Sequence, residues 1–189
     1  MDERLLPVVF YRRPGIAVAR DLLGRVLARR LPGGAVLRAP IVEVEAYDGP
    51  LDRASHAYPG RTARNAPMFR GGGIAYVYLI YGMHHCLNLV TGEEGHPSAV
   101  LLRAAAWADD PKAASGPGKL ARAFGIDRTL NGASLLGPDL WLEEGSPVPD
   151  PAVARSRRIG VDYAGAWASR RLRFFVRGHP SVSGPKRMR

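Results

Sequence analysis

The sequence predicts one α+β domain, and three observations lead to this fold class. The chain has 189 residues, of which 46% are hydrophobic, so it is long enough to bury one sizeable core. Strand-like stretches are mixed with helix-like stretches, without a regular succession of strand, helix and strand. Internal repeats and low-complexity tracts are absent from the sequence. We therefore expect one domain over residues 1–180 and a basic, flexible tail over residues 181–189.

The first part of the chain is expected to supply a helix, a strand and a long loop. Over residues 17–31, apolar residues recur at helical spacing opposite a row of arginines, so an amphipathic helix is predicted to end before Gly33. The stretch VLRAPIVEVEAY, residues 36–47, is typical of a strand, in which Pro40 requires a bulge or an edge position. Residues 48–74 are rich in Gly, Pro, Arg and Asp, which indicates a long functional loop.

A hairpin, further strands and a short helix are predicted in the rest of the chain. AYVYLIYGMHHCLNLV, residues 75–90, has the pattern of a hairpin, and Tyr81 beside Gly82 suits a tight turn that leaves the tyrosine ring exposed. SGPGKLARAFGI is predicted to be a short helix with Ser115 as its N-cap and Pro117 in its first turn. Other strands are expected at SAVLLRAAAW, LWLEE and LRFFVRG.

The charge of the chain favours a polyanionic partner. Lys and Arg number 27 against 17 Asp and Glu, for a formal net charge of +10. Almost all of the basic residues are arginine, which suits bidentate contacts with phosphate, so nucleic acid is the favoured partner. A single cysteine, Cys86, agrees with a reducing compartment. Because no apolar run approaches the ~18 residues that cross a bilayer and the first residues do not match a secretory signal, we expect a cytoplasmic, nucleoid-associated protein without a membrane partner.

The predicted strand and the residues after it carry an unusual group of acids. Glutamate is depleted in strands, yet two glutamates here share a side with Tyr47 under strand alternation. One interpretation is a solvated outer face of the sheet. The other is a carboxylate beside an aromatic ring in a cleft, where it can act as a general base. The acids concerned are Glu43, Glu45, Asp48 and Asp52.

Other chemical motifs are weak. His56 lies in the predicted loop, where a lone histidine is more often a surface residue than a catalytic one. H-E-x-x-H and C-x-x-C spacings do not occur, so no metal site is expected. Residues 71–73 are three glycines without the frame of a phosphate loop. The SGPGK turn can hold a phosphate through Lys119 and free amides, although an ordinary helix start accounts for it equally well.

Several motifs together resemble the alkyladenine, or 3-methyladenine (methylpurine), DNA glycosylase family. They are IVEVEAYDGPLDRASHA, the loop RTARN-APMF, YVYLIYGMHHCLN, VLLRA, SGPGKL, RIGVDYAGAW and RFFVRG. The similarity extends from about FYRRP near residue 10 to about Pro180, and the compact bacterial form is expected. The resemblance implies a mostly antiparallel, curved sheet with flanking helices, a protruding hairpin that intercalates into DNA, and a monomer.

The resemblance also assigns roles in catalysis and DNA binding. Glu45 matches the general base that activates water, and Arg103 matches an arginine near this glutamate and the water. Tyr81 matches the tyrosine that enters the minor groove and takes the place of the flipped nucleotide. Arg64 and Lys119 are expected to contact phosphates.

A second set of positions matches the pocket that receives the flipped base. Tyr47 and Tyr78 fall at the aromatic positions that sandwich this base, and His56 lies opposite and contributes to its recognition. Asn88 matches a residue that crowds the exocyclic amine of normal guanine, and Val161 belongs to the same pocket.

The implied activity is the removal of damaged purines from duplex DNA. Such enzymes flip an alkylated or deaminated purine nucleotide out of the duplex and hydrolyse its N-glycosidic bond, which leaves an abasic site. None of the three lysines lies in the motifs that carry Glu45 or the hairpin, so a monofunctional enzyme without lyase activity, metal or cofactor is expected. Ala63 stands where relatives often have proline, and the glycines at 71–73 add freedom, so loop and hairpin geometry are left open.

The sequence is also compatible with three other functions. A basic binding module without catalysis would leave Glu45 unexplained. A metal-assisted nucleic-acid hydrolase would be inhibited by EDTA, and it would use Glu43, Glu45, Asp48 and His56. A glycosidase or nucleosidase for small molecules would act on free nucleosides without salt-sensitive DNA binding.

Overall fold

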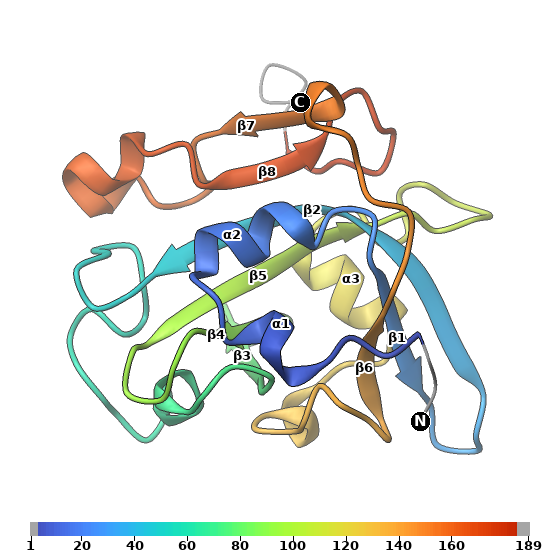
Figure 1. Cartoon of the computed structure of the whole chain (residues 1–189), viewed down its shortest axis with the longest axis horizontal. Helices are drawn as coiled ribbons and strands as arrows, with labels where there is room; N and C mark the ends of the chain where they lie inside the picture. The colour runs from blue at the N-terminus through green and yellow to red at the C-terminus, as the bar shows by residue number, and fades with distance from the viewer. Residues whose placement is uncertain (1–3, 185–189) are drawn as a thin grey trace.

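A curved, eight-stranded sheet forms the centre of the protein in a computed structural model that describes residues 4–184 (Figure 1). Every strand pair among the described residues is antiparallel. The order along the sheet is β3-β4-β5-β2-β1-β6, and β8 pairs with both β2 and β7. The predicted α+β domain with a mostly antiparallel, curved sheet is therefore confirmed. The strands are β1 Val26–Arg30, β2 Val36–Asp48, β3 Ala75–Ile80, β4 His84–Thr91, β5 Ser98–Ala105, β6 Leu140–Glu143, β7 Val153–Ser156 and β8 Arg173–Val176.

Strand β2 connects the parts of the sheet and carries Glu43, Glu45 and Asp48. It pairs with β1 up to Pro40 and with β5 from Ile41 onward, and its register with β5 shifts between Ile41 and Val44. This irregularity directly follows the exposed Pro40, which agrees with the predicted bulge. Residues 43–45 pair with β5 on one edge and with β8 on the other, so they lie inside the sheet rather than at its rim.

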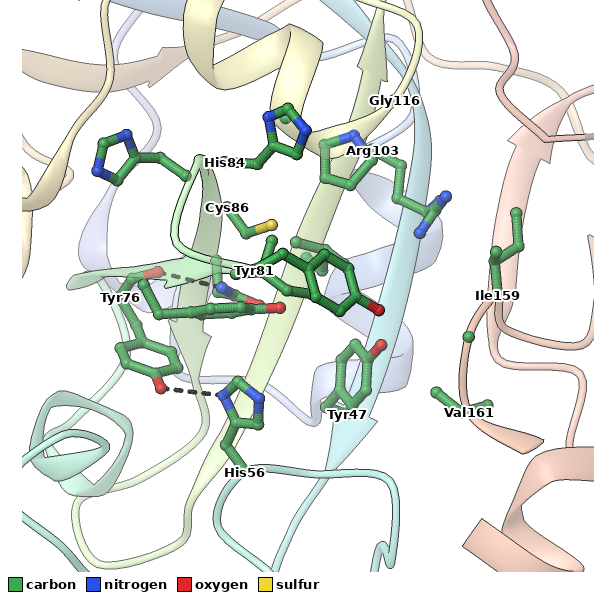
Figure 2. Close-up of a pocket in the computed structure, with 18 of the residues that line it drawn as sticks. Tyr47, His56, Tyr76, Tyr81, His84, Cys86, Arg103, Gly116, Ile159 and Val161 are labelled. Carbon is green, nitrogen blue, oxygen red and sulfur yellow. Dashed lines mark hydrogen bonds between the residues drawn. The ribbon is translucent and has the colours of Figure 1, made fainter. Parts of the chain in front are cut away.

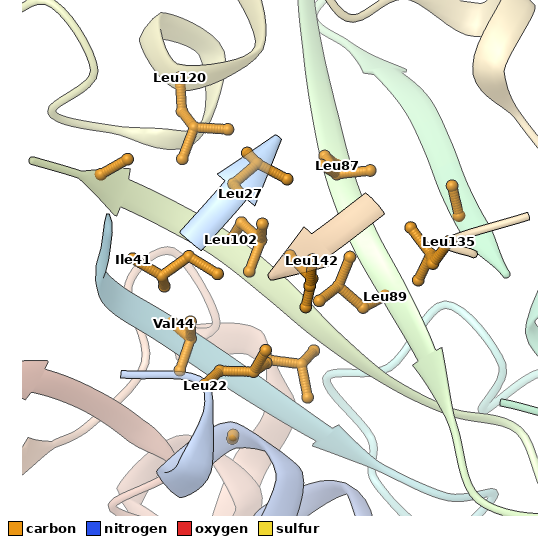
Figure 3. Close-up of a cluster of buried hydrophobic side chains, with 14 of the residues drawn as sticks. Leu22, Leu27, Ile41, Val44, Leu87, Leu89, Leu102, Leu120, Leu135 and Leu142 are labelled. Atoms are coloured by element: carbon orange, nitrogen blue, oxygen red, sulfur yellow. The ribbon is translucent and has the colours of Figure 1, made fainter. Parts of the chain in front are cut away.

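Short helices flank the sheet. Helix α2 packs on β2 and β5, and α3 packs on β4 and β5. Leu22 after α2 and Leu120 of α3 belong to one apolar cluster with Val44 and Leu102, so both helical segments cover the same face (Figure 3). The helices are α1 Val8–Tyr11, α2 Gly15–Asp21, α3 Pro117–Ala123 and the 3-10 helices η1 Ala66–Phe69, η2 Arg128–Leu130, η3 Asp150–Ala152 and η4 Asp162–Ser169.

Strand alternation gives the sheet two chemically different faces. On one face, alternate side chains of β2, β4 and β5 join the apolar core, as Val44, Leu87 and Leu102 do (Figure 3). On the opposite face, the intervening positions carry polar and aromatic side chains, such as Asn88 and Arg103. The period of two along each strand thus separates the core from the candidate site.

The helix predicted over residues 17–31 is wrong in its second half. Helix α2 ends at Asp21, and the following segment turns at Gly24 into strand β1. Gly24 has φ +86°, and a Cβ atom there would lie 2.0 Å from the carbonyl oxygen of Ser146. Helical spacing of the apolar residues is therefore overridden by a glycine-specific turn and by pairing of β1 with β2 and β6.

The predicted start of α3 is partly corrected. Pro117 is the first helical residue, as expected. The N-cap is Gly116 with φ +118°, and no side chain caps the helix. Ser115 instead forms a β-bridge with Ala104, so its backbone extends the sheet. The predicted N-cap at Ser115 is wrong because the sheet, rather than the helix, takes up that residue.

The glycine segment before the hairpin is packed closely against α1. A Cβ atom at Gly72 would lie 2.4 Å from the carbonyl oxygen of Tyr11. Gly72 and Gly73 donate backbone hydrogen bonds to Gly92 and Val90. Glycine at position 72 therefore allows a close approach of two backbones at the base of the hairpin.

Part of the predicted flexible tail is packed in the structure. Ser181, Val182 and Ser183 are buried, and the backbone N–H of Ser183 donates to Glu43 Oε2 at 2.6 Å. The prediction of a tail from residue 181 is therefore wrong for 181–184, because these residues bury polar groups against the sheet. Residues 185–189 lie outside the described part of the chain.

Candidate active site

A pocket of about 850 Å³ lies on the polar face of the sheet. Its walls come from β2, β3, β4 and β5, from the hairpin tip, from the start of α3 and from the segment around Val161 (Figure 2). Tyr47, Tyr78 and Arg103 point into it because each occupies the strand position opposite a core residue. Residues far apart in sequence thus meet in one cavity.

The five residues predicted to hold a base all line this pocket. They are Tyr47, His56, Tyr78, Asn88 and Val161. The ring centroids of His56 and Tyr78 are 4.5 Å apart with an interplanar angle of 67°, so these rings meet edge to face. Figure 2 shows Tyr47 between His56 and the segment that carries Ile159 and Val161. The cavity is therefore bounded by flat aromatic surfaces, which suit a planar heterocycle.

His56 is oriented by Tyr76. The two side chains share a hydrogen bond of 3.0 Å between His56 Nδ1 and Tyr76 Oη (Figure 2). Partial burial lowers the pKa of His56 below its ordinary value of 6.5, and the charge of Arg64 lowers it further. A neutral imidazole is therefore favoured in the pocket. Tyr76 is itself fully buried.

Asn88 is held in place by a hydrogen bond to the neighbouring strand. Its Nδ2 donates to the backbone carbonyl of Tyr76 at 3.1 Å across the β3–β4 pair (Figure 2). The side chain is 4% exposed and borders the cavity. A fixed amide at the floor of the pocket can exclude a base by shape, because it has little room to move.

Glu45 lies directly behind the pocket wall. Its carboxylate is fully buried, so the solvated outer face considered for this strand is wrong. Oε1 accepts from the backbone N–H of Ile159 at 2.8 Å and lies 3.3 Å from Arg103 Nη1, while Oε2 accepts from Tyr47 Oη at 3.1 Å. Ile159, Arg103 and Tyr47 all line the cavity, so the carboxylate is one side chain removed from it.

Tyr47 is supported on its far side by a buried ion pair that sequence reasoning missed. The Arg158 guanidinium lies 4.6 Å from the centre of the Tyr47 ring. Arg158 Nη1 and Nη2 donate to Asp52 Oδ2 and Oδ1 at 2.5 and 2.9 Å. Burial raises the pKa of Tyr47 well above its ordinary value, and the charge of Glu45 raises it further, so the phenol keeps the proton that it donates to Glu45.

Arg103 and the glutamates form a second buried cluster. Arg103 Nε donates to Glu43 Oε1 at 2.9 Å, and Arg173 Nε donates to the same oxygen at 2.7 Å. Arg103 was predicted near Glu45, and the structure brings these two residues together. The contribution of Arg173 was missed. The available signal was the position of Arg173 between the apolar residues Leu172 and Phe174 of LRFFVRG.

The hairpin tip presents an exposed tyrosine at the edge of the pocket. Strands β3 and β4 pair from Ala75 opposite Leu89 to Ile80 opposite His84. The backbone N–H of Met83 donates to the carbonyl of Ile80 and closes the turn. Tyr81 has φ +52° and Gly82 φ +70°, and the Tyr81 side chain is 84% exposed. Positive φ at both central residues is the mark of a type I′ turn. The turn thus holds an aromatic ring in solvent, as predicted.

Two predicted phosphate contacts lie at the surface beside the pocket. Arg64 is exposed, its Nη2 donates to the carbonyl of Leu79 at 3.3 Å, and its guanidinium lies 5.6 Å from the Tyr78 ring centre. Lys119 is exposed in the first turn of α3 and lines the pocket at that end. Both cations therefore remain accessible to an anionic ligand.

The described residues were also compared with the requirements for a metal site and for a membrane-spanning helix. Among residues 4–184, we find no group of three or more His, Cys, Asp or Glu side chains arranged to hold a metal ion. His84 and His85 border the pocket at the hairpin end (His84 is labelled in Figure 2). Within the same residues, the helices are too short or too polar to span a membrane.

Comparison with known proteins assigns the chain to a family. Residues 9–180 match the family model described as methylpurine-DNA glycosylase (MPG). A protein of Anaeromyxobacter dehalogenans strain 2CP-1 named "Putative 3-methyladenine DNA glycosylase" is 55% identical over 95% of this chain and 86% of its own length. The human "DNA-3-methyladenine glycosylase" is 41% identical over 94% of this chain and 67% of its own length. The chain therefore belongs to the methylpurine-DNA glycosylase family.

Proposed function

We propose that this DNA glycosylase flips damaged purines into the pocket and hydrolyses their N-glycosidic bond. The observation that carries the proposal is the buried Glu45 carboxylate directly behind an aromatic cavity whose mouth carries the exposed Tyr81. A carboxylate of this kind suits proton transfer from water, and an exposed ring beside the cavity suits the opening of a duplex. The substrates proposed are alkylated and deaminated purines.

Base flipping is supported by the hairpin tip. Extruding a nucleotide from a duplex costs a few kcal/mol in lost pairing and stacking. The Tyr81 ring is 84% exposed, so it can stack between the neighbouring bases without leaving a packed site in the protein. Tyr47 and Tyr78 then stack with the extruded purine, and such stacking is worth about 1–3 kcal/mol per base.

Selection among purines follows from the charge and shape of the side chains that line the pocket. A cationic alkylated purine is attracted by the faces of Tyr47 and Tyr78, because their rings carry negative charge density. The neutral imidazole favoured at His56 avoids repulsion of such a cation. Asn88, held by its bond to Tyr76, excludes the exocyclic amine of normal guanine.

The reaction breaks the bond between C1′ of the sugar and N9 of the purine. The bonding electron pair leaves with the base, and positive charge develops on the sugar. A water molecule adds to C1′ and gives a proton to Glu45, whose carboxylate also stabilises the positive charge.

The product is an intact strand with an abasic site. A lyase step would need an amine that attacks C1′. Lys119 lines the pocket at its α3 end, whereas Glu45 is reached through Tyr47, Arg103 and Ile159. We therefore assign Lys119 to phosphate binding and expect a monofunctional enzyme.

Excision assays test this proposal directly. Duplex oligonucleotides with a single hypoxanthine, ethenoadenine or 3-methyladenine are incubated with the enzyme in EDTA, and free base is measured. Release of damaged base, with strand cleavage only after added alkali, is expected. Cleavage without alkali that disappears in Lys119→Ala would overturn the monofunctional assignment. Salt-sensitive duplex binding without release of any base would identify a binding module instead.

A further inference from the structure

We propose that Ser183 and Glu43 are positioning residues that hold Arg103 for the excision reaction. This inference rests on the proposed function, because it concerns the groups around Glu45. It gives the C-terminal segment 181–184 a part in the active site.

Arg103 is shared between two buried glutamates. Its Nε donates to Glu43 Oε1 at 2.9 Å, and its Nη1 lies 3.3 Å from Glu45 Oε1. Both carboxylates are fully buried, and the Arg103 side chain lines the pocket. The placement of one guanidinium therefore determines how much positive charge the Glu45 carboxylate meets.

Among the described residues, Glu43 accepts hydrogen bonds from four donors on three residues. Oε1 accepts from Arg103 Nε, from Arg173 Nε at 2.7 Å and from Ser183 Oγ at 2.9 Å, while Oε2 accepts from Ser183 N at 2.6 Å. Burial acts to raise the pKa of Glu43. The charges of Arg103 and Arg173 and the Ser183 N–H outweigh it and lower that pKa below its ordinary value. The carboxylate is therefore a fixed, ionised anchor.

The Ser183 hydroxyl connects the Glu43 carboxylate to Nη2 of Arg103. Arg103 Nη2 donates to Ser183 Oγ at 3.2 Å, and the same hydroxyl donates to Glu43 Oε1. The carbonyl of Ser183 accepts from Arg173 Nη2 at 2.9 Å. Two of the three guanidinium nitrogens of Arg103 are thus occupied by Glu43 and Ser183, which directs Nη1 towards Glu45.

The extent to which Arg103 neutralises the Glu45 carboxylate matters at the transition state. Positive charge on the sugar is stabilised by the part of the Glu45 charge that Arg103 does not neutralise. Removing the Ser183 hydroxyl releases Nη2, so the guanidinium can rotate into a closer pair with Glu45. The chemical step should slow, whereas duplex binding, which occurs at the outer surface, should not change.

The test uses full-length enzyme under single-turnover conditions with a lesion duplex. Ser183→Ala is compared with Ser181→Ala, a matched control two residues away that is equally buried and whose Oγ has no hydrogen-bond partner among the described residues. We expect Ser183→Ala to slow base release roughly 10-fold or more, because small misplacements of catalytic groups have effects of this size. The Kd for DNA should match that of Ser181→Ala, whereas the melting temperature should be lower, because only Ser183→Ala loses two buried hydrogen bonds.

Glu43→Gln provides a second variant, since it keeps the shape of the side chain and removes its charge. It should slow release more than Ser183→Ala does, again at unchanged Kd. Equal rates for Ser183→Ala, Ser181→Ala and wild type would overturn the inference and leave the proposed function intact. Failure of the wild type to release any base would overturn the proposed function itself, so the two failures are distinguishable.

Discussion

Replacing Tyr81 by glycine should stabilise the fold while weakening the enzyme. Tyr81 has φ +52°, a left-handed conformation that costs a residue with a Cβ atom about 1–2 kcal/mol. Glycine avoids this cost but loses about 0.5–1 kcal/mol through its greater freedom in the unfolded chain. Because the ring is 84% exposed, little packing is lost. Tyr81→Gly should therefore raise the free energy of unfolding by about 0–1.5 kcal/mol.

Tyr81→Ala separates the backbone effect from the ring effect. It keeps the left-handed strain and removes the same ring, so its free energy of unfolding should stay within about 0.5 kcal/mol of wild type. Both variants lose the group that replaces the flipped nucleotide. With stacking worth about 1–3 kcal/mol, each should excise a damaged purine about 5- to 150-fold more slowly. Tyr81→Trp, which keeps an aromatic ring, should retain most of the rate.

The assays are urea unfolding and single-turnover base release from a lesion duplex. Tyr58→Ala is the control, because Tyr58 is also exposed and does not line the pocket. Wild-type excision by both Tyr81 variants would refute the role of the ring in flipping. A loss of more than about 1 kcal/mol of stability in Tyr81→Ala would show instead that the tip packs against the protein.

Three further predictions concern the pocket and its support. An NMR titration should give His56 a pKa below 6.5. The contribution of the neutral His56 side chain to stability is then present above pH 6.5 and is lost as the pH falls. A pKa at or above 6.5 would contradict a neutral imidazole. Asp52→Asn leaves the buried Arg158 unpaired and should lower the free energy of unfolding by about 3–5 kcal/mol in urea, whereas a change below about 1 kcal/mol would show that the pair is dispensable. EDTA should leave excision unchanged, and a rate restored only by added divalent metal would favour a metal-assisted reaction.

Much of the site could be predicted because it depends on local patterns. Alternation along β2 and β5 places Glu45 and Arg103 opposite apolar residues whose burial is evident from the sequence. The Tyr81–Gly82 pair indicates its own turn. The resemblance to a known family supplied the roles of these positions, which the patterns alone left open between a solvated face and a general base.

The supporting groups could not be predicted because they depend on contacts distant in sequence. Arg158 and Asp52 are 106 residues apart, and Ser183 and Glu43 are 140 residues apart. The sequence around Asp52 is typical of a surface loop, and the sequence around Ser183 is typical of a loose tail. The helix expected over residues 17–31 failed for a related reason, since the pairing of β1 with two other strands decides that segment.

The most direct test of the account is single-turnover base release by Glu45→Gln. Glutamine keeps an acceptor for Ile159 N and the shape of the side chain, so the fold and duplex affinity should persist. Glu143→Gln is the matched control, as Glu143 is also buried and pairs with Arg38 in a position that does not line the pocket. Glu45→Gln should lose about 10²–10⁴-fold in rate, and Glu143→Gln should lose none. Excision by Glu45→Gln at the wild-type rate would contradict the assignment of the buried carboxylate as the base.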